Sequence, residues 1–214
     1  MAVQAVKFLQ AKSDDQGYFV MIEGGRIDHA HHNGQAVRAL SEALAFDKAV
    51  EEVLKIVDLE DTLVIVTADH SHTMSMGGYN GREEDITGVV IEADGNADLG
   101  EDGKPFTVLS YGNGPGFKRF NGTGVGDFKK VDRNPLEKGE KAGMTYLQAS
   151  PAPLAAETHG GDDVGIWAAG PMAHLFHRVH EQSYIGHVMS YAACVGPHKE
   201  KQRCINRADS GAEV

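Results

Sequence analysis

Three short stretches of the chain concentrate carboxylates and imidazoles, the side chains that bind divalent metal ions and transfer protons. The first stretch contains Glu23, Asp28 and His32, and the last two lie four residues apart. Four residues is about one helical turn, so Asp28 and His32 could face a single point if this segment is helical. Taken alone, the pair of Glu23 and Asp28 is equally well explained as a solvated turn.

The second stretch holds Asp69, His70 and His72 directly after an apolar run, and the third holds His159 before two glycines. Each has a plain alternative, because an Asp–His pair after a strand is usually a hydrogen-bonded loop pair and a single histidine is usually a turn residue. Together the three stretches favour metal binding. They offer more ligands than one zinc needs, and two metal ions ~3.5–4 Å apart form a clamp used in phosphoryl transfer.

The elements around the first two stretches would bring them to one edge of a sheet. Apolar runs at residues 17–23 and 62–68 predict buried strands. Between them, apolar residues from 37 to 57 recur at helical spacing, which predicts a helix that opens at Asn33 or Gly34. Strand, helix and strand form a βαβ unit, such units build parallel sheets, and ligands bind at the carboxyl edge of those sheets.

The rest of the chain divides by its texture. Residues 80–156 are rich in glycine and have one clear strand at 106–111, which indicates an inserted subdomain. A third strand is predicted at 164–169 and a further helix within 179–194. The expected organisation is an α/β core with its metal-binding loops, an insertion, the continued core and a polar tail, at residues 1–79, 80–156, 157–196 and 197–214.

Composition excludes several classes of protein. The chain has 214 residues, a formal net charge of −11 and 41% hydrophobic residues. It is too apolar for a disordered protein, has no run approaching the ~18 apolar residues of a membrane span, and is too acidic for a typical nucleic-acid binder. Its first ten residues lack the apolar run of a signal peptide, which by itself would indicate the cytosol.

Long motifs around these stretches resemble the animal-type alkaline phosphatases. The matching runs are residues 18–32, 66–72, 157–161, 170–182 and 191–194, with residues 104–116 similar to the family's inserted crown region. The resemblance implies an α/β fold, a three-layer sandwich with a mostly parallel central sheet and a crown-like subdomain. It also implies hydrolysis of phosphate monoesters, at alkaline pH, through a phosphoserine intermediate.

By position, the resemblance implies two zinc sites and one magnesium site. The first zinc would be held by Asp28, His32 and His159, the second zinc by Asp69 and His70, and the magnesium by Glu23. The first zinc would bind substrate phosphate and later activate water, and the second would activate a serine nucleophile. His72 resembles a residue that orients a ligand carboxylate, and His29 is expected to tune the metal and phosphate environment.

The family's nucleophile belongs to an Asp-Ser-Ala segment, and this sequence contains none: its only Asp-Ser pair is Asp209–Ser210. The family's phosphate-binding arginine is also missing, because Arg26 matches a different family position, and so is an early aspartate shared by zinc and magnesium. We therefore expect that this chain has no nucleophilic serine. We also expect it to be the C-terminal portion of an alkaline phosphatase, without the N-terminal half. Met1 would be an internal methionine, and the isolated chain would be inactive.

The resemblance further implies an extracellular or cell-surface setting, with a homodimer and a glycolipid membrane anchor in the full-length form. Expected ligands are phosphate monoesters and inorganic phosphate, with no nucleic acid. Cys194 and Cys204 could close a disulfide, which an extracellular setting favours, or remain free thiols. Asn121 begins a glycosylation sequon that is equally an Asn-Gly turn.

Two other interpretations stay open. The chain could belong to a related phosphodiesterase or sulfatase of the same superfamily, although the crown-like segment favours the monoesterase. It could instead be a non-catalytic, metal-binding or dimer-forming pseudoenzyme. His174, His177 and His180 are spaced by three and could form a metal-binding face, but packing and surface roles are favoured for them.

Overall fold

The computed structural model describes residues 1–13, 17–117, 136–201 and Cys204. It divides into two compact units. The first unit comprises Met1–Glu23, Asp47–His70 and Asp163–Val214, and the second comprises Gly24–Phe46 and Ser71–Asp162. No helix of the described part of the chain is long and apolar enough to cross a membrane.

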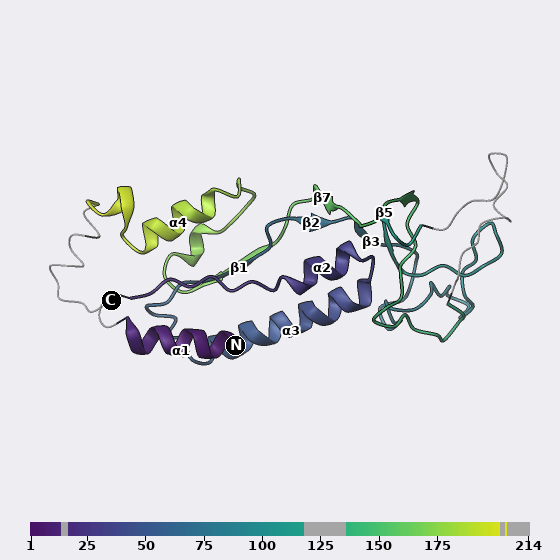
Figure 1. Ribbon diagram of the computed structural model, residues 1–214, viewed down its shortest axis with the longest axis horizontal. Coiled ribbons are helices and arrows are strands. Elements are labelled where there is room, and N and C mark those ends of the chain that lie inside the picture. Colours follow the sequence, from purple (N-terminus) through teal and green to yellow (C-terminus); the bar gives the residue numbers. More distant parts are fainter. Residues whose placement is uncertain (14–16, 118–135, 202–203, 205–214) are drawn as a thin grey trace. The chain divides into compact units, whose positions relative to one another are not determined.

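Four α-helices are assigned along the described ranges (Figure 1). They are α1 (Ala2–Lys12), α2 (Arg26–His32), α3 (Ala36–Leu54) and α4 (Tyr184–Ala192), with 3₁₀ turns at Ala173–Leu175 and Gly196–His198. The predicted long helix is confirmed as α3, and α4 lies within the predicted range 179–194. Small buried side chains at Ala36 and Ala39 let the start of α3 pack closely. Helix α1 was not among the predicted elements.

In the first unit, β1 (Val64–Thr67) pairs with β8 (Ile166–Ala169) in an antiparallel sheet that aligns Val66 with Trp167. Both strands fall inside predicted runs, at 62–68 and 164–169. Gly170 follows β8 with φ of 100°, and a Cβ there would collide with the backbone of Thr62. Cys194, just after α4, forms a disulfide with Cys204.

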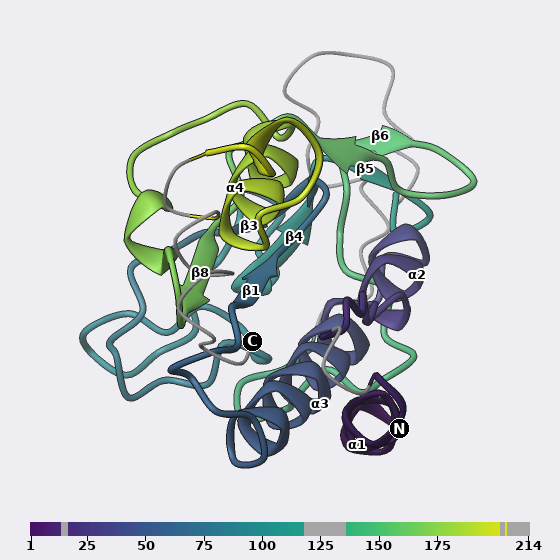
Figure 2. The same cartoon turned by 90° about the vertical axis from the view of Figure 1, so that its left-hand side faces the viewer.

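In the described part of the second unit, three further strand pairs form, two of which Figure 2 shows side by side as β3–β4 and β5–β6. The pairs are β2 (Ser71–His72) with β7 (His159–Gly160), β3 (Met74–Met76) with β4 (Leu109–Tyr111), and β5 (Asn113–Gly114) with β6 (Ala152–Pro153). The first two are antiparallel and the third is parallel. Ala36, Leu109 and Tyr111 form the buried core of this unit, with Leu40 and Met74 packed against it.

One predicted element is wrong. Residues 17–23 form no strand, and Phe19 and Met21 in this run are 72% and 79% exposed. An extended segment becomes a strand only when a neighbour pairs with its backbone, and no described strand does so here. The expected βαβ unit is therefore absent. The described residues combine helices with four two-stranded sheets, of which only β5–β6 is parallel, in place of one mostly parallel sheet.

Candidate metal centre

Helix α2 delivers Asp28 and His32 to one side of the second unit. The helix ends where Gly34, with φ of 66°, adopts a left-handed conformation that its missing side chain allows. The Gly34 amide then donates to the carbonyl of His31 over 2.7 Å. Asp28 and His32 lie one turn apart on this helix, and His32 Nε2 is 3.2 Å from Asp28 Oδ1. The segment that holds Asp28 and His32 is therefore helical, as metal binding by this pair required.

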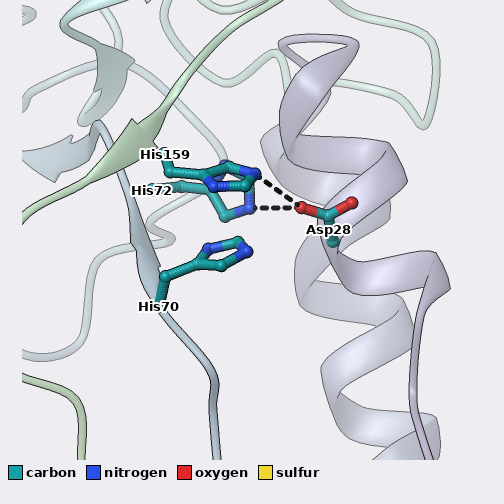
Figure 3. A group of neighbouring side chains, drawn as sticks. All are labelled: Asp28, His70, His72 and His159. Atoms are coloured by element: carbon teal, nitrogen blue, oxygen red, sulfur yellow. Dashed lines mark hydrogen bonds and ion pairs between the residues drawn. The ribbon is translucent and has the colours of Figure 1, made fainter.

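The short β2–β7 ladder brings in the other two imidazoles. Its register places His72 opposite His159, although the two residues are 87 positions apart in the chain. Residues directly opposite in a ladder project from the same face of the sheet. Figure 3 shows both rings turned toward the Asp28 carboxylate on the neighbouring helix. His72 Nε2 lies 3.0 Å and His159 Nε2 lies 3.6 Å from Asp28 Oδ1.

Asp28, His32 and His159 form a compact triangle of ligand atoms. Its three sides are 3.2 Å from His32 to Asp28, 3.6 Å from His159 to Asp28, and 3.2 Å between the Nε2 atoms of the two histidines. Zinc bonds of about 2.0–2.1 Å place neighbouring ligands of a tetrahedral site about 3.3–3.4 Å apart. One carboxylate and two imidazoles at this spacing could therefore hold a divalent metal ion such as zinc.

His72 lies beside this triangle and contacts a second carboxylate. Its Nδ1 is 2.7 Å from Glu157 Oε2, while its Nε2 faces Asp28. Asp28, His72 and His159 belong to one group of potential metal ligands, and His32, His72 and Glu157 to another. Because the two ring nitrogens of His72 are directed at two different carboxylates, its position suits a residue that orients Asp28.

Charge and burial set the protonation of the surrounding groups. Partial burial raises the pKa of the Asp28 carboxyl, but His32 and a hydrogen-bonded His72 outweigh that effect, so the pKa lies below its usual value. Burial and the neighbouring His72 lower the pKa of His31 to about 4. Burial, with the Glu157 carboxylate, raises the pKa of Tyr111 above its usual value. At neutral pH, His31 and Tyr111 are therefore uncharged and Asp28 is ionised. His31 Nδ1 lies 2.8 Å from the Tyr111 hydroxyl oxygen.

The other predicted metal ligands belong to the first unit. Asp69 and His70 follow β1, where Asp69 Oδ2 lies 3.3 Å from His70 Nε2 and the Asp69 side chain is 79% exposed. Glu23 is exposed at the end of the unit's first segment. His70, labelled in Figure 3, is the last residue of the segment Asp47–His70 of the first unit.

His29 lies one residue from Asp28 but on another side of α2. With Arg26 and Arg38 it lines an open hollow on the surface of the second unit. In the first unit, the His180 ring stacks on Tyr184 with centroids 4.0 Å apart, and His177 Nδ1 lies 3.1 Å from the Leu175 carbonyl oxygen. The first contact is a ring stack and the second is a hydrogen bond to a nearby backbone carbonyl. Asn121 lies outside the described residues.

Glu157 is a prominent residue of the site that was not predicted from the sequence. Glu157 is 1% exposed and anchors the second ring nitrogen of His72. Its position two residues before His159 was visible in the sequence, but a glutamate beside a loop histidine usually lies in solvent. Only the fold shows that it is buried. Tyr111, whose hydroxyl meets the inner His31, was likewise visible only as part of a strand.

The family model described as "Alkaline phosphatase" matches residues 1–195. The tissue-nonspecific isozyme of alkaline phosphatase from Felis catus is 44% identical over 207 residues, which cover 97% of this chain and 36% of the relative. The Homo sapiens isozyme is 44% identical over 92% of this chain and 34% of its own length, and an alkaline phosphatase from Gadus morhua is 43% identical over 93% and 38%.

The chain thus spans about a third of the length of the curated relatives it matches. The match covers the α2 segment and the β2–β7 ladder alike, since both fall within residues 1–195. The sequence motifs, the coverage of the family model and the level of identity agree. This chain belongs to the alkaline phosphatase family.

Proposed function

We propose that this chain supplies the metal-binding part of an alkaline phosphatase that hydrolyses phosphate monoesters. The observation that carries the proposal is the triangle of Asp28, His32 and His159, whose 3.2–3.6 Å sides suit one zinc ion. Family membership supports the class of reaction, since the relatives are named as alkaline phosphatases. Inorganic phosphate, the product, would bind at the same site.

In this proposal, Asp28, His32 and His159 hold the first zinc, Asp69 and His70 contribute to the second, and Glu23 binds magnesium. Zinc at these positions would supply Lewis acidity, which stabilises negative charge on phosphoryl oxygens and lowers the pKa of a bound water molecule toward ~7. The residues of this chain orient that chemistry: His72 contacts Asp28, and the Glu157 carbonyl lies 2.6 Å from His32 Nδ1. His29 would tune the surroundings from its neighbouring turn.

The serine nucleophile of this mechanism would come from polypeptide outside these 214 residues, because no Asp-Ser-Ala segment occurs in them. Hydrolysis would then proceed through a phosphoserine, with the phosphoryl group passing first to that serine and next to water. We also propose the family setting: a three-layer core, a crown-like insertion at 80–156, and an extracellular or cell-surface homodimer with a glycolipid anchor in the full-length form.

The test measures zinc binding and turnover separately. Isothermal titration of the metal-free chain with zinc should show binding that Asp28→Asn weakens more than about 100-fold, since even contacts around ligands are worth 10–100-fold. The matched control is His177→Gln, which changes a histidine of the first unit whose ring contacts Leu175 and His180, and it should bind zinc like the parent chain.

The same chain, supplied with zinc, magnesium and an aryl phosphate, should show no turnover above buffer. Robust hydrolysis would disprove the claim that this chain lacks a nucleophile. Absence of zinc binding, or equal binding by the Asp28→Asn variant, would contradict the metal centre and favour a pseudoenzyme that serves another purpose.

A further inference from the structure

Glu157 is a buried carboxylate for which neither the sequence motifs nor the proposed mechanism provides a task. It is 1% exposed, and its side chain is fully enclosed. Burying a carboxylate costs several kcal/mol unless hydrogen bonds replace its lost water. The partners of the Glu157 carboxylate therefore show how its burial is compensated and which residues it constrains.

Among the described residues, the hydrogen-bond partners of the Glu157 side chain are His72 on β2 and Thr73, the residue that follows this strand. Its Oε1 accepts hydrogen bonds from the backbone N–H of Thr73 over 2.7 Å and from the Thr73 hydroxyl over 2.6 Å. Its Oε2 lies 2.7 Å from His72 Nδ1. Three donors in a fixed arrangement hold the carboxylate in one orientation, and this carboxylate in turn holds the imidazole of His72.

His72 passes this constraint on to Asp28. With Nδ1 directed at Glu157, the ring places Nε2 at 3.0 Å from Asp28 Oδ1. His72 is 7% exposed at its side chain, and its ring stacks on His31 with centroids 4.5 Å apart, so the ring has little freedom to turn. The series Glu157, His72, Asp28 therefore runs from a buried anchor to an atom of the metal triangle.

The backbone of Glu157 constrains a second member of the triangle. Its N–H donates to the carbonyl of His32 over 2.9 Å, and its own carbonyl lies 2.6 Å from His32 Nδ1. That contact directs His32 Nε2 toward Asp28 and His159. Asn113 clamps the following residue, because its side chain exchanges two hydrogen bonds with Thr158 at 2.8 and 3.0 Å.

We propose that Glu157 is the positioning residue of the metal centre: it fixes His72, and through His72 the orientation of Asp28. Glu157 does not touch the reacting atoms in this assignment. The identity of the ion rests on the proposed function, whereas the linkage through His72 does not, and the experiment separates the two.

The first arm measures the linkage in the metal-free chain. The enclosed Nδ1–H of His72 should give a slowly exchanging imidazole proton in the NMR spectrum, assigned with His72→Ala. Glu157→Leu should abolish this signal by removing its acceptor. Gln148→Met is the control, because Gln148 is also 1% exposed in the same unit and its amide has no hydrogen-bond partner among the described residues. It should leave the signal unchanged.

The second arm measures zinc affinity by competition with a chromogenic chelator. Glu157→Gln should weaken binding by about 10-fold, the lower end of the effect of contacts behind metal ligands. In a His72→Ala background the same change should cost nothing further, since residues that act in series are not additive. Gln148→Met should bind as the parent chain does. Should Glu157→Gln fail to fold, Thr73→Val, which removes one of three donors, should show a smaller loss in the same direction.

Two results overturn the proposal: a His72 signal that persists in Glu157→Leu, or a Glu157→Gln effect on zinc of full size in the His72→Ala background. If the parent chain binds no zinc but the NMR signal behaves as expected, the proposed function fails and the anchoring of His72 by Glu157 stands.

Discussion

Asp28 Oδ1 faces three imidazole nitrogens, which come from His32, His72 and His159 at 3.2, 3.0 and 3.6 Å. A ring nitrogen without a proton and a carboxylate oxygen are both acceptors, so they repel each other at this distance. Imidazoles that converge on one carboxylate oxygen are therefore favourable only when their facing nitrogens carry protons or when a cation lies among them. At the scale of single residues, the centre is thus a set of ligand atoms whose spacing suits a metal. The geometry of this centre depends on the orientation of a few side chains. Replacing a single carboxylate oxygen by an amide nitrogen should therefore change metal affinity measurably.

Asp85, also in the second unit, is a carboxylate whose contacts make the stability of the fold depend on pH. Asp85 accepts hydrogen bonds from the Thr87 N–H and hydroxyl at 2.8 and 2.6 Å, and pairs with Lys141 Nζ at 2.6 Å. The hydrogen bond from Lys141 and those from Thr87 hold the pKa of Asp85 well below its usual value.

Because the folded-state pKa of Asp85 is depressed, its contribution to stability is present above the unfolded pKa of about 4 and is lost as pH falls toward the folded value. We expect Asp85→Asn to lower the unfolding free energy by less than about 1 kcal/mol at pH 7, since the pair is exposed. The difference should shrink below pH 4. Urea unfolding at pH 7 and pH 3 measures it, and a difference that grows in acid would refute the assignment.

At the scale of elements, glycine geometry decides how close the segments come. After β8, Gly170 holds φ of 100° against the backbone of Thr62, which precedes β1. A side chain here meets a rigid carbonyl rather than a movable side chain. The β1–β8 pair therefore depends on this position more than its four-residue strands suggest.

Gly170→Ala should destabilise the first unit by about 2–3 kcal/mol, because it adds a backbone collision to the strain of a left-handed conformation. Gly17→Ala provides a matched control in the same unit: Gly17 has φ of 69°, but nothing lies within 4 Å of the added carbon. It should cost only about 1 kcal/mol. Thermal unfolding of both variants checks the order, and equal losses would show that the collision is relieved by movement.

At the scale of the whole molecule, the chain leaves much apolar surface in water. In the first unit Phe19, Met21 and Trp167 are 72%, 79% and 67% exposed. A sheet of two strands is marginally stable by itself, and open strand edges invite pairing with other chains. The exposed residues lie on an extended segment and on β8, the kinds of structure that pair in this way.

We therefore expect the isolated chain to self-associate as concentration rises. A Phe19→Ser, Met21→Ser, Trp167→Thr variant should stay smaller in light scattering over a concentration series. Phe8→Ser, which changes a 63% exposed residue on a helix, should associate like the parent chain. A parent chain that remains monomeric at every concentration would contradict the expectation.

The spacing of residues along the chain was sufficient to predict several features. The one-turn spacing of Asp28 and His32, the helix now seen as α3, the β-branched run of β1 and the family motifs are local patterns, which are legible because helical and strand periods repeat over a few residues. The same patterns identified Asp28, His32 and His159 as candidate ligands. Their roles as zinc ligands, with those of Asp69, His70 and Glu23, remain proposals.

The meeting of distant segments depended on the fold. An apolar run at 17–23 satisfied every local criterion for a strand, yet no described neighbour pairs with it. The β2–β7 ladder sets His72 opposite His159 across 87 positions, and burial makes Glu157 the anchor of that arrangement. Strand pairing and burial depend on which surfaces meet in space. A one-dimensional pattern does not contain that information, whereas it does contain the residue types that the meeting surfaces use.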